Sequence, residues 1–221
     1  MDIDISPILG SWQFLASGLE VTLLLSLLTV LCSLVLGSAV GLARCYGPAW
    51  LRVPLVFYID SMRSIPVLVV LVWTYFALPA VSGVSMPPFW AALFALSAHI
   101  AAYVAEIVRA GVTSVRPGQT RAALALGMSH WQVVREIVLP QAIVRMLPAF
   151  GSVLSITIKD TAIASVIAVP EYMNRSQTLA GQSFRPVEVF ALAALVYFIM
   201  LFPVTRAVDI AYRRLAFLGR S

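Results

Sequence analysis

Long apolar runs separated by short polar stretches make up most of the chain. A helix needs about 20 apolar residues to cross a bilayer, and the runs are of that order. We expect spans at about residues 21–42, 62–80, 88–109, 140–158 and 187–210. The pattern therefore predicts an all-α integral membrane protein with about five transmembrane helices.

The polar stretches divide the chain into two parts. Residues 1–17 form a short acidic N-terminal segment, which we expect outside the cytoplasm. Residues 18–215 are expected to form one transmembrane domain, in which a polar loop covers residues 116–139. The second span is short, and we expect an interfacial helix before it that ends near Asp60.

The composition agrees with a membrane protein and argues against other classes. Hydrophobic residues make up 61% of the 221 residues and charged residues 11%, whereas soluble domains are about half apolar and about a quarter charged. The formal charge of +5 does not indicate nucleic-acid binding, because excess Lys and Arg in a membrane protein mostly sets its topology. Cys32 and Cys45 lack the clustered spacing of a metal site or a disulfide framework. The acidic first residues do not match a cleavable signal peptide.

Basic residues are distributed unevenly between the two sides that five spans would create. One side would hold Arg44, Arg52, Arg109, Arg116, Arg121, Arg135, Arg206, Arg213, Arg214 and Arg220. The other side would hold Arg175 and Arg185, together with the acidic N-terminus. Because Lys and Arg accumulate on the cytoplasmic side, we expect the loop 116–139 and the C-terminus in the cytoplasm and the N-terminus outside.

The polar loop is predicted to contain two short helices joined by a hinge. Alanine-rich helix formers follow Pro117 and Gly118 and favour the first helix. Gly127 stands where a left-handed helix end requires glycine. Ser129 and Gln132 have the spacing of a capping box that starts the second helix. From this chemistry alone, an ordinary interfacial helix between two spans is as good an interpretation as a helix that binds another protein.

The residue pattern of this loop resembles the EAA loop of ABC-importer permeases, and it looks most like the polar amino acid uptake branch. The residues that carry the resemblance are Gln119, Thr120, Arg121, Ala122, Ala123, Ala125, Leu126, Gly127, Met128, Ser129, Leu139 and Pro140. In that family the loop forms a cytoplasmic coupling helix, which docks into a groove on a separate ATPase subunit. The leading Glu of the family is Arg121 here, which reverses one charge at the implied contact.

Three further segments resemble the same family. Residues 102–109 (AYVAEIVR) are similar to its AYxAEIxR signature, residues 158–165 (IKDTAIAS) to its LKDTSLAS segment, and residues 63–66 (RSIP) in part to its RGTP segment. Glu106 and Arg109 are three residues apart on a helix, so we expect an ion pair between them. The pair either only closes a helix end or also braces the loop that transmits ATPase motion.

Lys159 and Asp160 place two adjacent charges between apolar runs, which is unfavourable unless each has a partner or faces water. On a helix the two side chains point about 100° apart and cannot simply pair with each other. A zwitterionic substrate could supply both partners, so Lys159, Asp160, Thr161 and Ser165 are candidates for the translocation path. A structural pair with Arg145 or with another span is the alternative.

Motifs for catalysis or ATP binding are absent from the sequence. The chain has no GxxxxGK(S/T) phosphate loop, no HExxH and no GxSxG. His99 and His130 are isolated, and we interpret both as packed or interfacial residues rather than as ligands. We therefore expect no cofactor or metal in this chain and no enzyme activity of its own. ATP and Mg²⁺ would bind to the partner ATPase subunit.

The resemblance covers residues 18–215 and implies the fold of a type I ABC importer. The chain would be its membrane-spanning permease in a bacterial inner membrane, and would move a polar amino acid or a related zwitterion. Implied partners are two ATPase subunits, a second permease subunit (a copy or a paralogue) and an extracytoplasmic solute-binding protein, which the outer loops 79–88 and 170–186 would contact. An ATPase-independent channel and a secondary transporter are the alternatives, although a secondary transporter usually needs more spans or an internal repeat.

Overall fold

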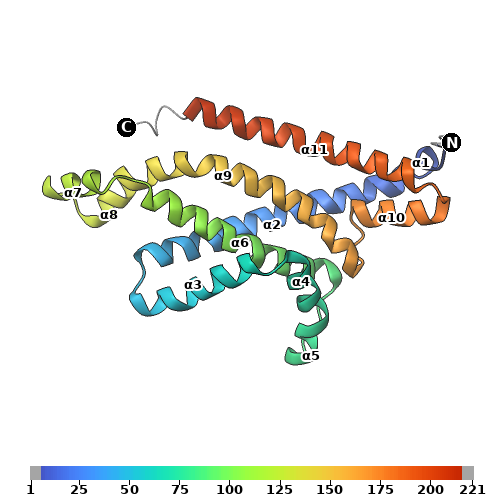
Figure 1. The fold of residues 1–221 in the computed structure, drawn as a ribbon, viewed down its shortest axis with the longest axis horizontal. Helices are drawn as coiled ribbons and strands as arrows, with labels where there is room; N and C mark the ends of the chain where they lie inside the picture. Colours follow the sequence, from blue (N-terminus) through green and yellow to red (C-terminus); the bar gives the residue numbers. More distant parts are fainter. Residues whose placement is uncertain (1–5, 216–221) are drawn as a thin grey trace.

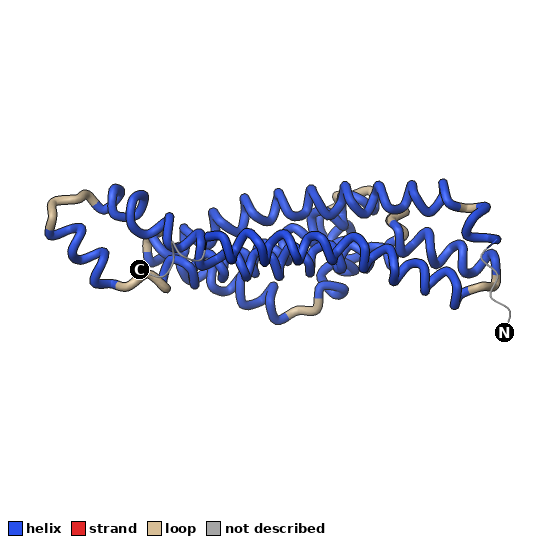
Figure 2. Tube along the Cα trace, turned by 90° about the horizontal axis from the view of Figure 1, so that it is seen from above, coloured by secondary structure: helices blue, strands red, loops and turns tan. Residues whose placement is uncertain are grey.

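The computed structural model describes residues 6–215, so residues 1–5 and Arg220 lie outside it, and Figure 1 shows a long helical bundle. The α-helices are α1 (Ser6–Gly10), α2 (Trp12–Tyr46), α3 (Ala49–Ser64), α4 (Val67–Val72), α5 (Leu78–Ser82), α6 (Pro88–Thr113), α7 (Pro117–Ala125), α8 (His130–Gln132), α9 (Leu139–Asp160), α10 (Tyr172–Ser183) and α11 (Pro186–Leu215). Two π-helical turns and one 3₁₀ segment continue them, namely η1 (Trp73–Ala77), η2 (Val133–Val138) and η3 (Thr161–Ile167). The described residues form helices and loops only (Figure 2), which confirms the all-α prediction.

The helices provide four or five candidate membrane spans among the described residues. Four stretches are long and apolar enough to cross a membrane, namely Trp12–Tyr46, Pro88–Thr113, His130–Ile167 and Pro186–Arg214. The pair formed by α3 and Val67–Ser82 is also apolar enough, but it bends by 108° and counts as a fifth span only if it is taken as one unit. The bend lies at Pro66, which holds Ile65 in an extended conformation with φ −91° and ψ 131°. The prediction of about five spans is therefore confirmed.

The long helices run side by side, and the short ones cap the two ends. α2, α6, α9 and α11 lie along the long axis of the molecule, whereas α4 and α5 project from its side (Figure 1). The hairpin, which consists of α7, α8 and residues 126–129 between them, stands at one end, and α1 and α10 stand at the other (Figure 1). α2 and α6 pack very closely, because a Cβ added at Gly37 would lie 2.6 Å from the carbonyl oxygen of Ala101.

The first helix is longer than expected, which corrects the predicted N-terminal segment. α2 begins at Trp12 rather than near residue 21, and residues 6–17 are almost entirely helical. Leu15 is buried in a cluster with residues of α10 and α11. These residues therefore belong to the bundle and do not form a separate segment. The apolar pattern missed them because Glu20 interrupts it.

Two further boundaries differ from the prediction. From His130 the chain is helical through η2 into α9, so the second half of the loop 116–139 is continuous with the fourth span. The π-helical turn ends at Val138, two residues before Pro140, which lacks a backbone N–H and would break a regular α-helix at this point. The last helix also continues past residue 210 to Leu215.

Candidate functional site

The hairpin is closed by hydrogen bonds among its own residues. α7 ends at Ala125, and Gly127, two residues further along, has a φ of 84° in the left-handed region. The N–H of Gly127 donates to the carbonyl oxygen of Leu124 (3.0 Å), and the N–H of Met128 donates to that of Ala123 (3.2 Å), which is the Schellman arrangement. Ser129 then starts α8 through a capping box with Gln132. The Gln132 N–H donates to Ser129 Oγ at 3.3 Å, and the Ser129 N–H donates to Gln132 Oε1 at 2.8 Å.

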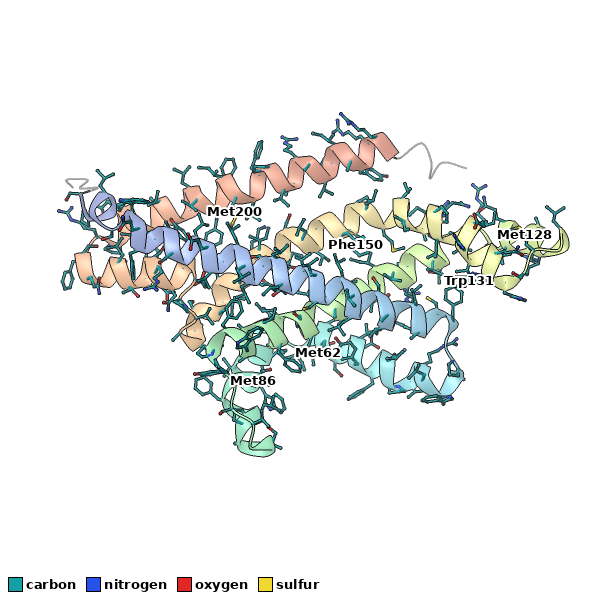
Figure 3. All side chains as sticks on the ribbon, turned by 180° about the vertical axis from the view of Figure 1, so that it is seen from behind. Met62, Met86, Met128, Trp131, Phe150 and Met200 are labelled. Carbon is teal, nitrogen blue, oxygen red and sulfur yellow. The ribbon has the colours of Figure 1, made fainter. Side chains whose placement is uncertain are left out.

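The outer surface of the hairpin combines small residues with exposed apolar ones. Ala123 is buried against the bundle, in a cluster that includes Val115 and Val133. Leu126 is 85% exposed and Trp131 is 68% exposed, and Figure 3 shows Trp131 and Met128 at this end of the molecule. Of the residues predicted for coupling, those from 119 to 129 lie in the hairpin, whereas Leu139 and Pro140 lie beyond it at the start of α9.

Charged side chains join the helix ends beside the hairpin. Glu106 Oε1 accepts from Arg109 Nη2 at 2.5 Å, and its Oε2 accepts from Arg44 Nη1 of α2 at 2.7 Å. The ion pair expected between Glu106 and Arg109 is therefore present, with Arg44 as a third member. Arg145 of α9 donates to the carbonyl oxygen of Ser114 at the end of α6, so it does not serve as the partner considered for Lys159 and Asp160.

A cavity of about 370 Å³ lies where the break between α3 and α4 meets α6 and α9. Its walls include Arg63, Ile65, His99, Tyr103, Ile156 and Asp160. The guanidinium carbon of Arg63 lies 5.7 Å from the centre of the Tyr103 ring. A second cavity of about 280 Å³ shares Arg63 and Tyr103 and extends to Glu106 and Arg145. Charged side chains therefore lie on the walls of both cavities, with Asp160 in the first and Glu106 and Arg145 in the second.

The structure separates the four residues suggested for the translocation path. Asp160 is partly buried and lines the 370 Å³ cavity. Lys159 is exposed and lines a different groove of about 310 Å³ between α9 and α11, where Asp209 is also found. Thr161 is fully buried and donates to the carbonyl oxygen of Ile158 at 2.8 Å, and Ser165 is partly buried. Of the four residues, only Asp160 therefore lies on the wall of the 370 Å³ cavity.

At the opposite end from the hairpin, the carboxylate of Glu171 caps α10 inside the bundle. Glu171 is 0% exposed, and its oxygens accept from the backbone N–H groups of Met173 (2.8 Å) and Asn174 (2.6 Å). The hydroxyls of Thr22 on α2 and Tyr197 on α11 each lie 3.4 Å from Oε2. Burial raises the pKa of Glu171 to about 6, although these hydrogen bonds oppose the rise.

Known proteins match the chain along most of its length. Residues 30–217 match the family described as binding-protein-dependent transport system inner membrane components. The chain belongs to this family. It is 38% identical to the glutamine transport system permease GlnP of Escherichia coli (strain K12), over 90% of this chain and 92% of that protein. The probable amino-acid ABC transporter permease YckA of Bacillus subtilis (strain 168) is also 38% identical, over 85% of this chain and 82% of that protein.

Solved structures of ABC transporters share the fold of this inner membrane component. A crystal structure of an amino acid ABC transporter with histidines has a TM-score of 0.90 and 32% identity, and the match covers 97% of this chain and 100% of that chain. An inward-facing structure of the methionine transporter MetNI has the same fold, with a TM-score of 0.80 and 21% identity over 93% of this chain and 98% of that chain. These matches confirm the predicted family and its permease fold.

Sequence reasoning missed three contributors to the sites of this permease. Arg44 lies 62 positions from Glu106, so no local spacing indicates the contact. His99 is buried as expected, but it also lines the cavity. Glu171 could have been found, because an acidic residue directly before a helix is a signal for an N-cap.

Proposed function

We propose that the chain is the membrane-spanning permease of an ATP-driven importer for a polar amino acid or a related small zwitterion. Relatives that are permeases of amino-acid ABC transporters support the class of solute. The complete complex would contain two ATPase subunits that bind ATP and Mg²⁺, a second permease subunit and an extracytoplasmic solute-binding protein. ATP and the loaded binding protein would shift the populations of inward-facing and outward-facing states.

The hairpin is the observation that carries this proposal. Its own hydrogen bonds hold its shape, and it leaves Leu126 and Trp131 exposed beyond the long helices. An exposed apolar surface on a polar segment is typical of a protein interface. A channel or a secondary transporter gives no reason for such a surface. We therefore assign the hairpin, including the exposed Arg121, to docking on the ATPase subunit.

The distribution of charge supports the orientation that docking requires. The described arginines near the hairpin include Arg44, Arg109, Arg116 and Arg135. Since basic residues accumulate on the cytoplasmic side, the hairpin and the C-terminus would be cytoplasmic and the N-terminus outside. α10 and residues 79–88, which include most of α5, would then face the solute-binding protein.

Asp160 is the strongest candidate among the residues proposed for the solute path. It lines a cavity that shares residues with a second cavity closer to the hairpin. Lys159 would contribute only through the separate groove between α9 and α11. Thr161 and Ser165 would support the turn that follows Asp160 rather than contact the solute, because Thr161 is fully buried.

A paired substitution tests docking on the hairpin. Leu126→Asp places a charge on a side chain that is 85% exposed, so the permease should still fold. Phe184→Asp is the matched control, because Phe184 is 88% exposed at the opposite end of the bundle. In mild detergent, wild type and Phe184→Asp should co-purify with the ATPase, and Leu126→Asp should retain at least ~10-fold less of it. Equal amounts of ATPase on Leu126→Asp would rule out the hairpin, and its absence from wild type would favour the channel alternative.

A further inference from the structure

His99 is a buried histidine with an unused hydrogen-bonding atom. His99 is 5% exposed, and its Nδ1 has no hydrogen-bond partner in the described part of the chain. Buried polar groups in native proteins nearly always have partners, so each exception needs an explanation. His99 also lines the 370 Å³ cavity. Because either ring nitrogen can be turned toward one side by a flip about χ2, the ring can offer a polar atom to an occupant of the cavity.

Two charged side chains lie on the walls of the same cavity. Arg63 is exposed at the break between α3 and α4, and Asp160 is partly buried at the end of α9. Neither residue forms an ion pair with another described residue. Tyr103 orders the group, since its ring lies 5.7 Å from the Arg63 guanidinium and 5.4 Å from the His99 ring. The cavity walls therefore carry the cation of Arg63, the carboxylate of Asp160 and the imidazole of His99, which when neutral can donate and accept a hydrogen bond.

We propose that His99 selects the transported solute. The proposal rests on the proposed import of a zwitterion, whose carboxylate Arg63 holds and whose ammonium Asp160 holds. His99 then hydrogen bonds the side chain of the solute. A neutral imidazole both donates and accepts, which suits an uncharged polar group such as an amide or a hydroxyl. An apolar side chain of the same size leaves the imidazole unpaired and binds more weakly, because a site built around a hydrogen bond rejects partners that lack it.

The test uses the purified permease–ATPase complex without the solute-binding protein, so that selectivity comes from the membrane subunits. The thermal unfolding midpoint is measured while glutamine, asparagine, serine, methionine or leucine is titrated. The variants are His99→Leu, His99→Gln and Ser97→Ala. Ser97 is the matched control, because it lies on the same helix, is 4% exposed and also has an unpartnered side-chain oxygen, but it does not line the cavity.

In wild type and in Ser97→Ala, at least one amino acid with an uncharged polar side chain should bind more tightly than methionine and leucine. His99→Leu should weaken the binding of that amino acid about tenfold or more and remove the preference. His99→Gln, whose amide donates and accepts, should keep part of it. An unchanged preference in His99→Leu would overturn the proposal.

Failure of the proposal can be distinguished from failure of the proposed function. If wild type co-purifies with the ATPase but no zwitterion stabilises it, the import complex stands and the role of His99 is refuted. If His99→Leu does not assemble, His99→Phe, which also removes the polar atoms, replaces it. Loss of assembly in both variants would show that His99 is structural, which also refutes the proposal.

Discussion

The hairpin and α10 are short capped elements at opposite ends of the bundle, and they are held in opposite ways (Figure 1). Every hydrogen bond that closes the hairpin joins residues at most five positions apart, from Ala123–Met128 to Ser129–Gln132. The cap of α10 instead brings Glu171 near Thr22, 149 positions away, and Tyr197, 26 positions away. The capping box of the hairpin is exposed, whereas Glu171 is fully buried.

This difference shows which element depends on the rest of the fold. The hydrogen bonds that shape the hairpin join only nearby residues, so its backbone conformation does not depend on contacts with distant segments. α10 is fastened to α2 and α11, and Arg175 adds a contact by lying 4.3 Å from the centre of the Phe14 ring. The position of α10 is therefore set by the packing of the bundle.

The largest expected effect follows from removal of the α10 cap. Glu171→Ala leaves two backbone N–H groups and the Tyr197 hydroxyl without their acceptor, whereas the Thr22 hydroxyl still donates to the carbonyl oxygen of Gly18. We expect a loss of about 3 kcal/mol in the free energy of unfolding, because buried polar groups become unpaired. Thermal unfolding of the purified permease measures it. Unchanged stability would contradict the view that α10 is fastened through this carboxylate.

A smaller effect is expected in the pH dependence of the free energy of unfolding, and it should arise from Glu171 at the α10 end. The pKa of Glu171 is raised to about 6 by burial, so the folded protein favours the protonated carboxyl. Its contribution to stability is therefore complete below the pKa of the unfolded chain and is lost as pH rises through about 6. Between about pH 7.5 and about pH 4.5, wild type should gain up to about 2 kcal/mol relative to Glu171→Gln. If the free energies of unfolding of wild type and Glu171→Gln change with pH by the same amount, this prediction is wrong.

The smallest expected effect is local to the hairpin. Ser129→Ala removes the side-chain acceptor for the Gln132 N–H and should destabilise the start of α8 by about 1 kcal/mol. Hydrogen exchange should become faster at residues 131–133 and remain unchanged in α10. The ratio of the exchange rates of variant and wild type should not depend on pH between about 5 and about 7.5, because no titratable group takes part in the cap. Faster exchange that spreads into α10 would show that the two ends are not independent.

The hairpin could be derived from the sequence because its signals are local. Gly127 and the spacing of Ser129 and Gln132 determine its backbone, and the structure has the same geometry. The cavity could not be derived in this way, because Arg63, His99 and Asp160 come from three segments that only the packing of α6 against α9 and the α3–α4 break brings together.

Asp160 was recognised as a candidate because a charge inside an apolar run is conspicuous. His99 gave no such signal, since a single histidine on an apolar helix is usually a packing residue. The length of α2 was also missed, because a charged residue near a helix end obscures hydrophobic periodicity even when the helix continues. The sequence thus predicted local backbone structure, but it did not predict contacts between residues that are distant along the chain.

The uninterrupted helical path from His130 to Asp160 has a mechanical consequence. At 1.5 Å per residue it forms a strut about 45 Å long. One end of this strut belongs to the hairpin, and the other carries Asp160, a wall residue of the 370 Å³ cavity. A push on the hairpin would therefore reach Asp160 through the backbone of one helix, with Pro148 and the π-helical turn as the sites where the strut can flex.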